Sequence, residues 1–168
     1  MKIRFLIAAA GLAAFAANAQ PAPNLSLPAA HVDKTGPENV IRHVGGADLK
    51  AALNSKKPSD ALTEVLLSGG NGYRVSNTLR DRDGLVEYHD EWYDHIFVQE
   101  GEATFLTGGT MVGAADTAPG EKRAASITGG TSTALHAGDY FMIPPHTPHQ
   151  MLVAKGHQIR FVVFKIRK

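Results

Sequence analysis

The 168-residue sequence contains no cysteine. This absence excludes disulfide bonds, thiol catalysis and thiolate metal ligands. A metal site in this chain would therefore have to be built from His, Asp and Glu side chains. If the protein is exported, its stability has to come from packing, from a bound metal or from a partner subunit.

An excess of charge is also missing, since 17 Lys and Arg residues stand against 16 Asp and Glu residues and the formal charge is +1. A nucleic-acid partner is not indicated, because proteins of that class usually concentrate basic residues. Beyond the N-terminal segment no apolar run reaches the length needed to span a bilayer, so no stable membrane anchor is expected.

Residues 1–19 have the pattern of a signal peptide. Two basic residues precede an apolar run over residues 5–15, which is too short to span a membrane. Ala17 and Ala19 supply the small residues that signal peptidase reads, so we expect cleavage before Gln20 and a periplasmic or secreted protein. An N-terminal core helix is the alternative, but the segment has no polar face and prolines follow it at once.

We expect residues 20–72 to form an extension ahead of the main domain. Pro, Ala, Asn and Gly dominate residues 20–46 without periodicity, which favours an extended arm that wraps the domain or the second subunit of a homodimer. Two short helices are expected, over residues 48–53 and 59–67, the second because a Pro-Ser start leads into an apolar stripe. The glycine-rich run at 69–72 would end this helix.

Residues 73–168 have the texture of a β domain. Short runs rich in apolar and β-branched residues alternate with glycine-containing turns, and no helical segment separates them. Such spacing predicts an all-β sandwich or barrel. The polar stretch 113–122 is expected to be a loop. The predicted strands cover residues 73–79, 85–89, 94–99, 103–107, 124–127, 139–143, 150–153 and 158–166.

Candidate metal ligands fall on three of these elements. Period-2 alternation places Glu87 and His89 on one face of a strand, and Asp94 begins the next strand across a turn. His149 arrives from a different direction, after a strand that ends at a Pro-Pro pair. Two histidines and a carboxylate on three elements suit a divalent first-row metal and leave positions open for substrate or dioxygen.

The two segments that carry these residues resemble the paired motifs of the cupin superfamily. In residues 84–103 a glycine-led strand holds two candidate ligands one residue apart, and Gly101 follows the acidic ligand by seven positions. In residues 138–149 a Gly-Asp strand runs into a proline and then His149. The resemblance covers about residues 73–164. It implies an antiparallel double-stranded β-helix, or jelly-roll barrel, behind a short helical N-terminal extension.

The first motif departs from the usual family pattern. Where the family usually has His-x-His, this chain has Glu87 and His89. At the position of the family's glutamate ligand, this chain has Asp94. If Glu87 does not ligate, Glu91 in the turn is the alternative. The ligand set that the resemblance implies is Glu87, His89, Asp94 and His149.

Two further histidines are expected outside the site. Strand alternation puts His95 on the face opposite Asp94. His146 stands where the second motif usually has glycine, and we expect it to be an exposed loop residue.

These features predict a secreted or periplasmic single-domain cupin that binds Fe(II), Mn(II), Ni(II) or Zn(II). The resemblance selects no single activity, because cupins host dioxygenases, isomerases, lyases and non-catalytic binders. We expect a metal-dependent enzyme acting on a small oxygenated molecule, with Glu87 moving protons beside the metal. The alternative is a non-catalytic barrel that binds a small molecule or a metal as a sensor or scavenger.

Overall fold

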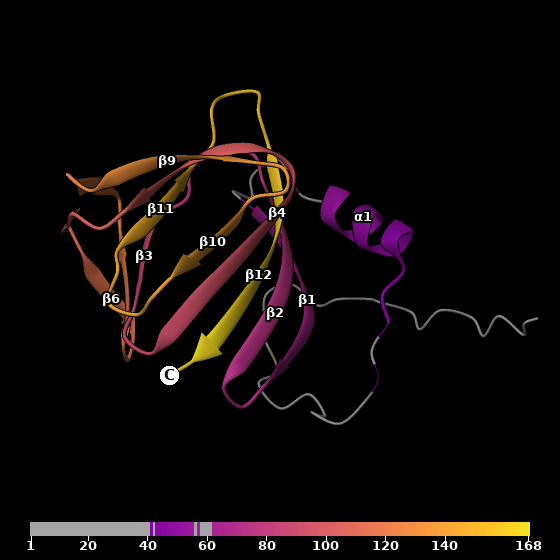
Figure 1. The fold of residues 1–168 in the computed structure, drawn as a ribbon, viewed down its shortest axis with the longest axis horizontal. Coiled ribbons are helices and arrows are strands. Elements are labelled where there is room, and N and C mark those ends of the chain that lie inside the picture. The colour runs from indigo at the N-terminus through magenta and orange to yellow at the C-terminus, as the bar shows by residue number, and fades with distance from the viewer. Residues whose placement is uncertain (1–40, 42, 56, 58–61) are drawn as a thin grey trace, which may run out of the picture.

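The computed structural model describes residues 41, 43–55, 57 and 62–168 (Figure 1). The predicted signal peptide and nearly all of the predicted arm lie outside these residues, so both stay predictions. Within the described residues, no helix is long and apolar enough to cross a membrane.

The first expected helix is confirmed and the second is wrong. Helix α1 spans Gly46–Asn54, but the segment expected to form a helix over 59–67 lies largely in strand β1, Leu62–Gly70. This strand pairs antiparallel with β2, Tyr73–Arg80. The glycine-rich run that was expected to end a helix makes the hairpin turn, where Gly72 adopts a φ of 96°. Pairing with a neighbouring strand outweighs local helix propensity here.

A small apolar cluster explains why β1 belongs to the sheet. Val65 of β1, Leu79 of β2 and Leu53 of α1 are all buried and pack together. The helix therefore covers the outer face of the β1–β2 hairpin (Figure 1). As a result the sheet begins at Leu62 rather than at Tyr73.

The remaining strands follow in quick succession. They are β3 (Val86–His89), β4 (Trp92–Thr107), β5 (Thr110–Val112), β6 (Ala115–Ala118), β7 (Glu121–Ala124), β8 (Ser126–Thr128), β9 (Thr131–His136), β10 (Tyr140–Ile143), β11 (His149–Leu152) and β12 (Ile159–Arg167). Strand β6 lies within the stretch 113–122, and β7 begins at the end of that stretch. That stretch was expected to be a loop, and this expectation is wrong because β7 pairs with β3 and so extends the sheet.

All strand pairings in the described residues are antiparallel. The main sheet runs in the order β1-β2-β12-β4-β11-β3-β7-β6, with β9 and β10 also pairing with β4, while β5 and β8 form a separate ladder. The sheet curls so that β3, β9 and β11 face β2, β12 and the first half of β4 (Figure 1). The expected all-β antiparallel barrel with a short N-terminal helix is confirmed.

Strand β4 joins the two layers. Its first part pairs with β10 and β12, and its last part pairs with β9 and β11. Between them lies Gly101, with a φ of 79°, and a β-carbon there would collide with the carbonyl group of Gln158. Glycine is therefore required both for the backbone conformation and for the close approach of β12.

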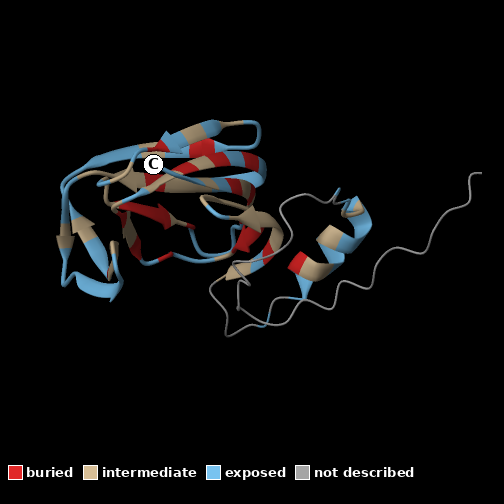
Figure 2. Cartoon of the chain, turned by 90° about the horizontal axis from the view of Figure 1, so that it is seen from below, coloured by how far each residue is buried: buried red, intermediate tan, exposed pale blue. Residues whose placement is uncertain are grey.

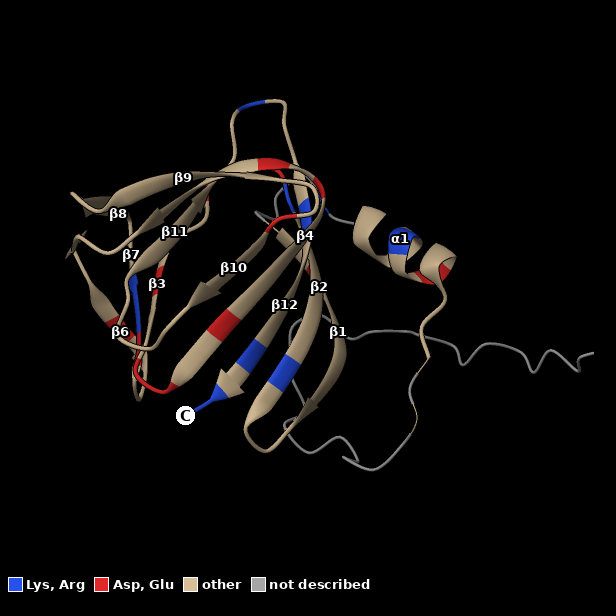
Figure 3. Cartoon of the chain, viewed as in Figure 1, with Lys and Arg blue, Asp and Glu red and all other residues tan. Residues whose placement is uncertain are grey.

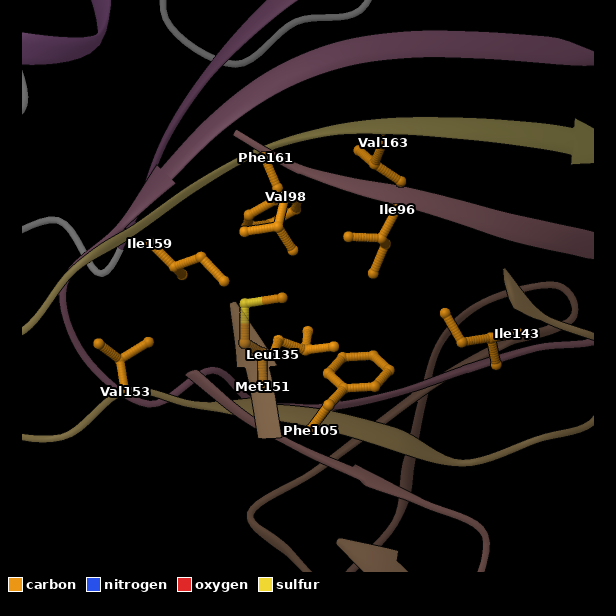
Figure 4. Packing of buried hydrophobic residues seen from close by; sticks show 10 residues of the cluster. All are labelled: Ile96, Val98, Phe105, Leu135, Ile143, Met151, Val153, Ile159, Phe161 and Val163. Atoms are coloured by element: carbon orange, nitrogen blue, oxygen red, sulfur yellow. The ribbon is translucent and has the colours of Figure 1, made fainter. Parts of the chain in front are cut away.

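The apolar core fills one end of the barrel. Inward side chains of β4 and β12 meet those of β9 and β11, as the close view in Figure 4 shows. Buried residues line the inside of the strands, whereas exposed residues lie on their outer sides and in the turns (Figure 2). The buried cluster consists of Ile96, Val98, Phe105, Leu135, Ile143, Met151, Val153, Ile159, Phe161 and Val163.

Candidate metal centre

Four expected ligands converge at the other end of the barrel interior. Glu87 and His89 come from β3, Asp94 from β4 and His149 from β11, and one ligand atom of each lies within 4.8 Å of the others. Glu87 and His149 are direct register partners across the β3–β11 pairing. His89, Asp94 and His149 are buried, whereas the Glu87 side chain remains 31% exposed. The structure therefore places together the residues that the two motifs indicated.

Hydrogen bonds orient both imidazole rings. His149 donates from Nδ1 to the Thr147 carbonyl oxygen at 2.9 Å, and His89 Nδ1 lies 2.6 Å from the Glu121 carboxylate. In each ring this leaves Nε2 facing Asp94, whose Oδ2 lies 3.5 Å from both nitrogens. A carboxylate or carbonyl behind a histidine is the usual support of a metal-binding imidazole, because it fixes the ring and the tautomer.

Lys165 of β12 places its ammonium group inside this set of ligands, a position that the sequence analysis did not anticipate. Its Nζ lies 2.6 Å from Asp94 Oδ2, 2.8 Å from His89 Nε2 and 3.8 Å from Glu87 Oε2. Figure 3 shows the corresponding acidic band on β4 beside a basic band on β12. The cluster therefore already surrounds one positive charge.

The donor set fits a divalent cation. Two imidazole nitrogens and two carboxylates are ligands that first-row metals accept, and the Lys165 ammonium stands where these ligands converge as a stand-in cation. The second carboxylate oxygen of Asp94, Oδ1, is buried and has no hydrogen-bond partner. A cation bound among these ligands would satisfy this buried oxygen.

Mutual charge interactions keep the carboxylates ionised. Burial alone raises the pKa of Asp94, but the Lys165 ammonium and the two histidines outweigh it and hold the pKa well below its usual range. For Glu87, burial is again outweighed, by the hydrogen bond with His89 and by Lys165, and its pKa is lowered. For His89, burial is outweighed by hydrogen bonds with Asp94 and Glu87, which raise its pKa to about 9.

Positive charge stands beside the carboxylates of the centre. Lys165 Nζ lies 2.6 Å from Asp94 Oδ2, and the raised pKa of His89 favours its protonated form at neutral pH. A metal ion that binds here must displace that charge.

A second layer of charged residues surrounds Glu87. Arg123 of β7 approaches Glu87 Oε2 with one guanidinium nitrogen and Glu121 Oε2 with another, each at 3.4 Å. The register places Arg123 opposite Glu87 and Glu121 opposite His89. These residues were missed because they lie at the end of the stretch that was expected to be a loop.

The other candidate residues lie outside the cluster. Glu91, the alternative ligand, pairs with Arg167 at 2.5 Å. His95 faces outward and its Nδ1 lies 2.8 Å from the Tyr140 hydroxyl. His146 is 59% exposed and lies near Asp90. It is also the only non-glycine residue in the described part of the chain with a positive φ, at 64°, a conformation that glycine adopts without strain.

Gln150 lies in the wall of the interior. Its buried side-chain amide donates to the Gly84 carbonyl oxygen at 2.8 Å and to the Ala125 carbonyl oxygen at 3.2 Å. This amide therefore ties the segment before β3 to β11, next to His149.

The four candidate ligands open onto a cavity of about 1410 Å³. Besides the ligands, its lining includes the apolar side chains of Ile96, Phe105 and Phe161 and the charged side chains of Arg80 and Lys165. A cavity with mostly apolar walls and a few convergent polar groups is the usual form of a small-molecule site.

Comparison with known proteins identifies the fold. The sequence matches no protein-family model and no curated protein sequence. In structure, the polyketide cyclase RemF of Streptomyces resistomycificus aligns with a TM-score of 0.52 at 17% identity, over 76% of this chain and 82% of its own. The cupin domain of Cnp3 from Schizosaccharomyces pombe aligns with a TM-score of 0.50 at 8% identity, over 69% and 72% of the two chains. The chain has a cupin-type fold.

A third similar structure supports the same architecture. An uncharacterized conserved protein with a double-stranded β-helix domain, from Klebsiella pneumoniae subsp. pneumoniae, aligns with a TM-score of 0.52 at 16% identity, over 70% of this chain and 85% of its own. The expected cupin fold is therefore confirmed. At these identities the likeness concerns the fold alone, and the activity of this protein has to be argued from its site.

Proposed function

We propose that this cupin binds one divalent first-row metal ion and acts as a metal-dependent enzyme on a small oxygenated molecule. The observation that carries the proposal is the convergence of two imidazole Nε2 atoms and two carboxylates around a single cationic position at the edge of a cavity. His89, His149 and Asp94 would hold the metal, with Glu87 as the fourth ligand. The donor set suits Fe(II), Mn(II), Ni(II) and Zn(II) alike.

A bound metal would polarise a substrate oxygen or, if redox-active, anchor dioxygen. The chain itself supplies the proton acceptor. Glu87 is the most exposed of the four candidate ligands, and its lowered pKa keeps it a carboxylate at neutral pH. Its Oε2 lies 3.4 Å from the Arg123 guanidinium, which orients it. If the metal is held by His89, His149 and Asp94 alone, we assign to Glu87 Oε2 the role of accepting a proton from the substrate.

Lys165 favours a second candidate function, in which the barrel works without a metal. Its ammonium already contacts Asp94 and His89 at hydrogen-bond distance, so the centre is charge-compensated by the chain alone. In that case this cupin is a non-catalytic binder of a small molecule, a sensor or scavenger. The two functions differ in one measurable property, which is whether metal ions displace the lysine.

Metal content and oxygen consumption test the proposal. We would express the protein with its native N-terminus, determine bound metals by elemental analysis, and then exchange Fe(II), Mn(II), Ni(II) or Zn(II) under anaerobic conditions before screening dioxygen uptake with small oxygenated compounds. We expect one metal per chain in the wild type and none in His149→Ala. Equal metal content in both proteins would reject the site and favour the metal-free binder.

The cellular location and the assembly belong to the same proposal. We propose export after cleavage before Gln20. N-terminal sequencing of the mature protein tests the cleavage, and retention of Met1 in a cytoplasmic product would reject it.

We also propose that two chains associate through the segment 20–46. Light scattering of a chain lacking residues 20–46 tests this association. An unchanged mass and stability would show that the arm has another purpose.

A further inference from the structure

Arg80 is a buried charge for which the described residues provide no ion-pair partner. It is the last residue of β2 and only 6% exposed, and its register partners in the neighbouring strands are Leu62 and Ile159. Its side chain lines the same cavity as the candidate metal centre. The guanidinium Nε has no hydrogen-bond partner, and no ion pair or hydrogen bond of this side chain occurs within the described residues.

The other arginines of the cavity differ from Arg80 in having carboxylate partners within ion-pair distance. Arg74, on the same strand, places its guanidinium 2.7 Å from the Glu64 carboxylate. Arg123 lies 3.4 Å from both Glu87 and Glu121. Each of these guanidinium groups has a carboxylate within ion-pair distance, whereas Arg80 has none among the described residues.

The surroundings hold the Arg80 side chain in place. Its guanidinium lies against Gly84, where an added β-carbon would be 2.6 Å from one terminal nitrogen. Gly84 is itself fixed, because its carbonyl oxygen accepts the Gln150 amide and its own amide nitrogen donates to the Met151 carbonyl oxygen at 2.9 Å. The guanidinium is therefore held in a fixed environment rather than free to move to solvent.

Such an arrangement costs folding free energy, since the buried Nε has lost its hydration without gaining a hydrogen bond. Burial lowers the pKa of Arg80, but a guanidinium remains charged under all ordinary conditions. Carboxylates of Glu87, Asp83, Asp81 and Glu64 act on Arg80 from beyond ion-pair distance. These negative charges disfavour a dianion such as phosphate more than a monoanion, and a single carboxylate matches the planar fork of arginine.

We propose that Arg80 binds the carboxylate of a small monoanionic ligand inside the barrel. The apolar part of the ligand lies along the side chains that line the cavity, and its remaining oxygen atoms are available to the metal centre. That this ligand is the substrate rests on the function proposed above. The anion site itself does not.

Benzoate is a suitable probe, because it combines one carboxylate with an apolar body. We would titrate benzoate into the metal-free full-length protein and follow the Nε–H resonance of Arg80 by NMR, assigning it by its absence in Arg80→Met. We expect this resonance to shift and benzoate to raise the melting temperature. In Arg80→Met, benzoate affinity should fall roughly ten- to a hundredfold, the loss expected for a charged hydrogen bond.

Two matched variants separate binding from a structural role. Arg74→Met removes a guanidinium from the same strand and cavity, and it should leave benzoate affinity unchanged. Arg80→Met should melt, without ligand, at the same or a higher temperature than wild type, because it removes an unpaired buried charge. If Arg80→Met does not fold, Arg80→Lys keeps the charge and removes the fork, and it should bind benzoate more weakly than wild type.

The outcomes distinguish this proposal from the metal proposal. Benzoate binding that needs Arg80 supports the anion site whether or not metal binds, so a failure of metal binding alone would reject only the proposed enzyme. Equal benzoate affinity in wild type, Arg80→Met and Arg80→Lys would overturn the anion site even if metal binds. Tighter binding of inorganic phosphate than of benzoate would overturn the carboxylate assignment.

Discussion

The two ends of the barrel interior are built by the same strands but filled in opposite ways. On β12, Ile159 at one end is fully buried among apolar side chains, whereas Lys165 at the other end contacts Asp94 and His89. On β4, the inward side chain of Val98 belongs to the apolar cluster and that of Asp94 to the charged one. Each of the two strands therefore contributes side chains to the apolar core at one end and to the candidate metal centre at the other.

This difference separates two physical tasks. The apolar end gains free energy by removing hydrocarbon from water, and that gain needs no further component. The charged end loses hydration and recovers it only through pairing, so its stability depends on which cation occupies the centre. We therefore expect substitutions at the apolar end to change stability and those at the charged end to change metal binding and pH dependence.

The largest effect is expected from Ile159→Ala at the apolar end. Truncating a fully buried isoleucine leaves a cavity and should lower the free energy of unfolding by about 2–5 kcal/mol. Chemical denaturation measures the change. The metal stoichiometry of the folded variant should stay the same, and a loss of metal at temperatures where the variant is folded would show that the two ends are not independent.

Asp94→Asn should have the largest effect at the charged end. The change keeps the shape of the side chain but removes the negative charge that offsets the cation, so metal affinity should fall by more than about 100-fold. Isothermal titration measures this affinity. His95→Ala is the control, because its imidazole lies on the outer face beside Tyr140. Similar losses in the two variants would contradict the site.

Lys165→Met should act in the opposite direction on metal binding. Removing a hydrogen-bonded ammonium that competes for the same ligands should tighten metal binding roughly ten- to a hundredfold. The same change leaves Asp94 without its cation, so the metal-free variant should melt at a lower temperature than wild type. Lys122 is half-buried and pairs with Asp116 at 3.6 Å, away from the candidate ligands, and it supplies the control variant Lys122→Met. Unchanged metal affinity in Lys165→Met would show that the lysine does not compete with the ion.

Glu121→Gln tests the support behind His89. Loss of the charged partner at Nδ1 should weaken metal binding about 10- to 100-fold, the usual cost of changing an outer-shell carboxylate. A chemically similar pair occurs outside the site, where Glu102 lies 2.9 Å from His157, and Glu102→Gln should leave metal binding unchanged. If both substitutions have the same small effect, Glu121 does not support the ligand.

The smallest effect is a change of stability with pH. Because the folded pKa of His89 is raised to about 9, the folded protein binds more protons than the unfolded chain above about 6.5. The melting temperature of the metal-free protein should therefore fall as pH rises from about 6.5 to 9. The lowered pKa values of Asp94 and Glu87 should reduce stability again below about pH 4.

Metal should change this pH profile, because it replaces the proton at the centre. The decline above about pH 6.5 should be absent in the metal-loaded protein, and metal affinity should increase over the same range. Thermal melts in chelator and in excess metal measure both profiles. A decline that persists in His89→Gln would show that another group causes it.

The sequence by itself determined much of the barrel and its motifs. Alternation placed Glu87 and His89 on one face, and that face is the inner one. The glycine of the first motif, Gly101, indeed stands where β4 passes between layers. Such features are local, since strand period and backbone conformation depend on neighbouring residues. The prediction of a helix over 59–67 was wrong because this segment pairs with β2, and that pairing depends on residues outside the segment.

The tertiary structure decided which charges meet. Lys165 continues the inward alternation of Phe161 and Val163, so its face could have been inferred from the sequence. That its ammonium contacts Asp94 and His89 could not, because the contact spans 71 and 76 residues of sequence and needs the sheet to close. The same holds for Arg80, because only the closed cavity decides that no described residue forms an ion pair with it. A local pattern fixes the direction in which a side chain points, and only the packed fold fixes what it meets there.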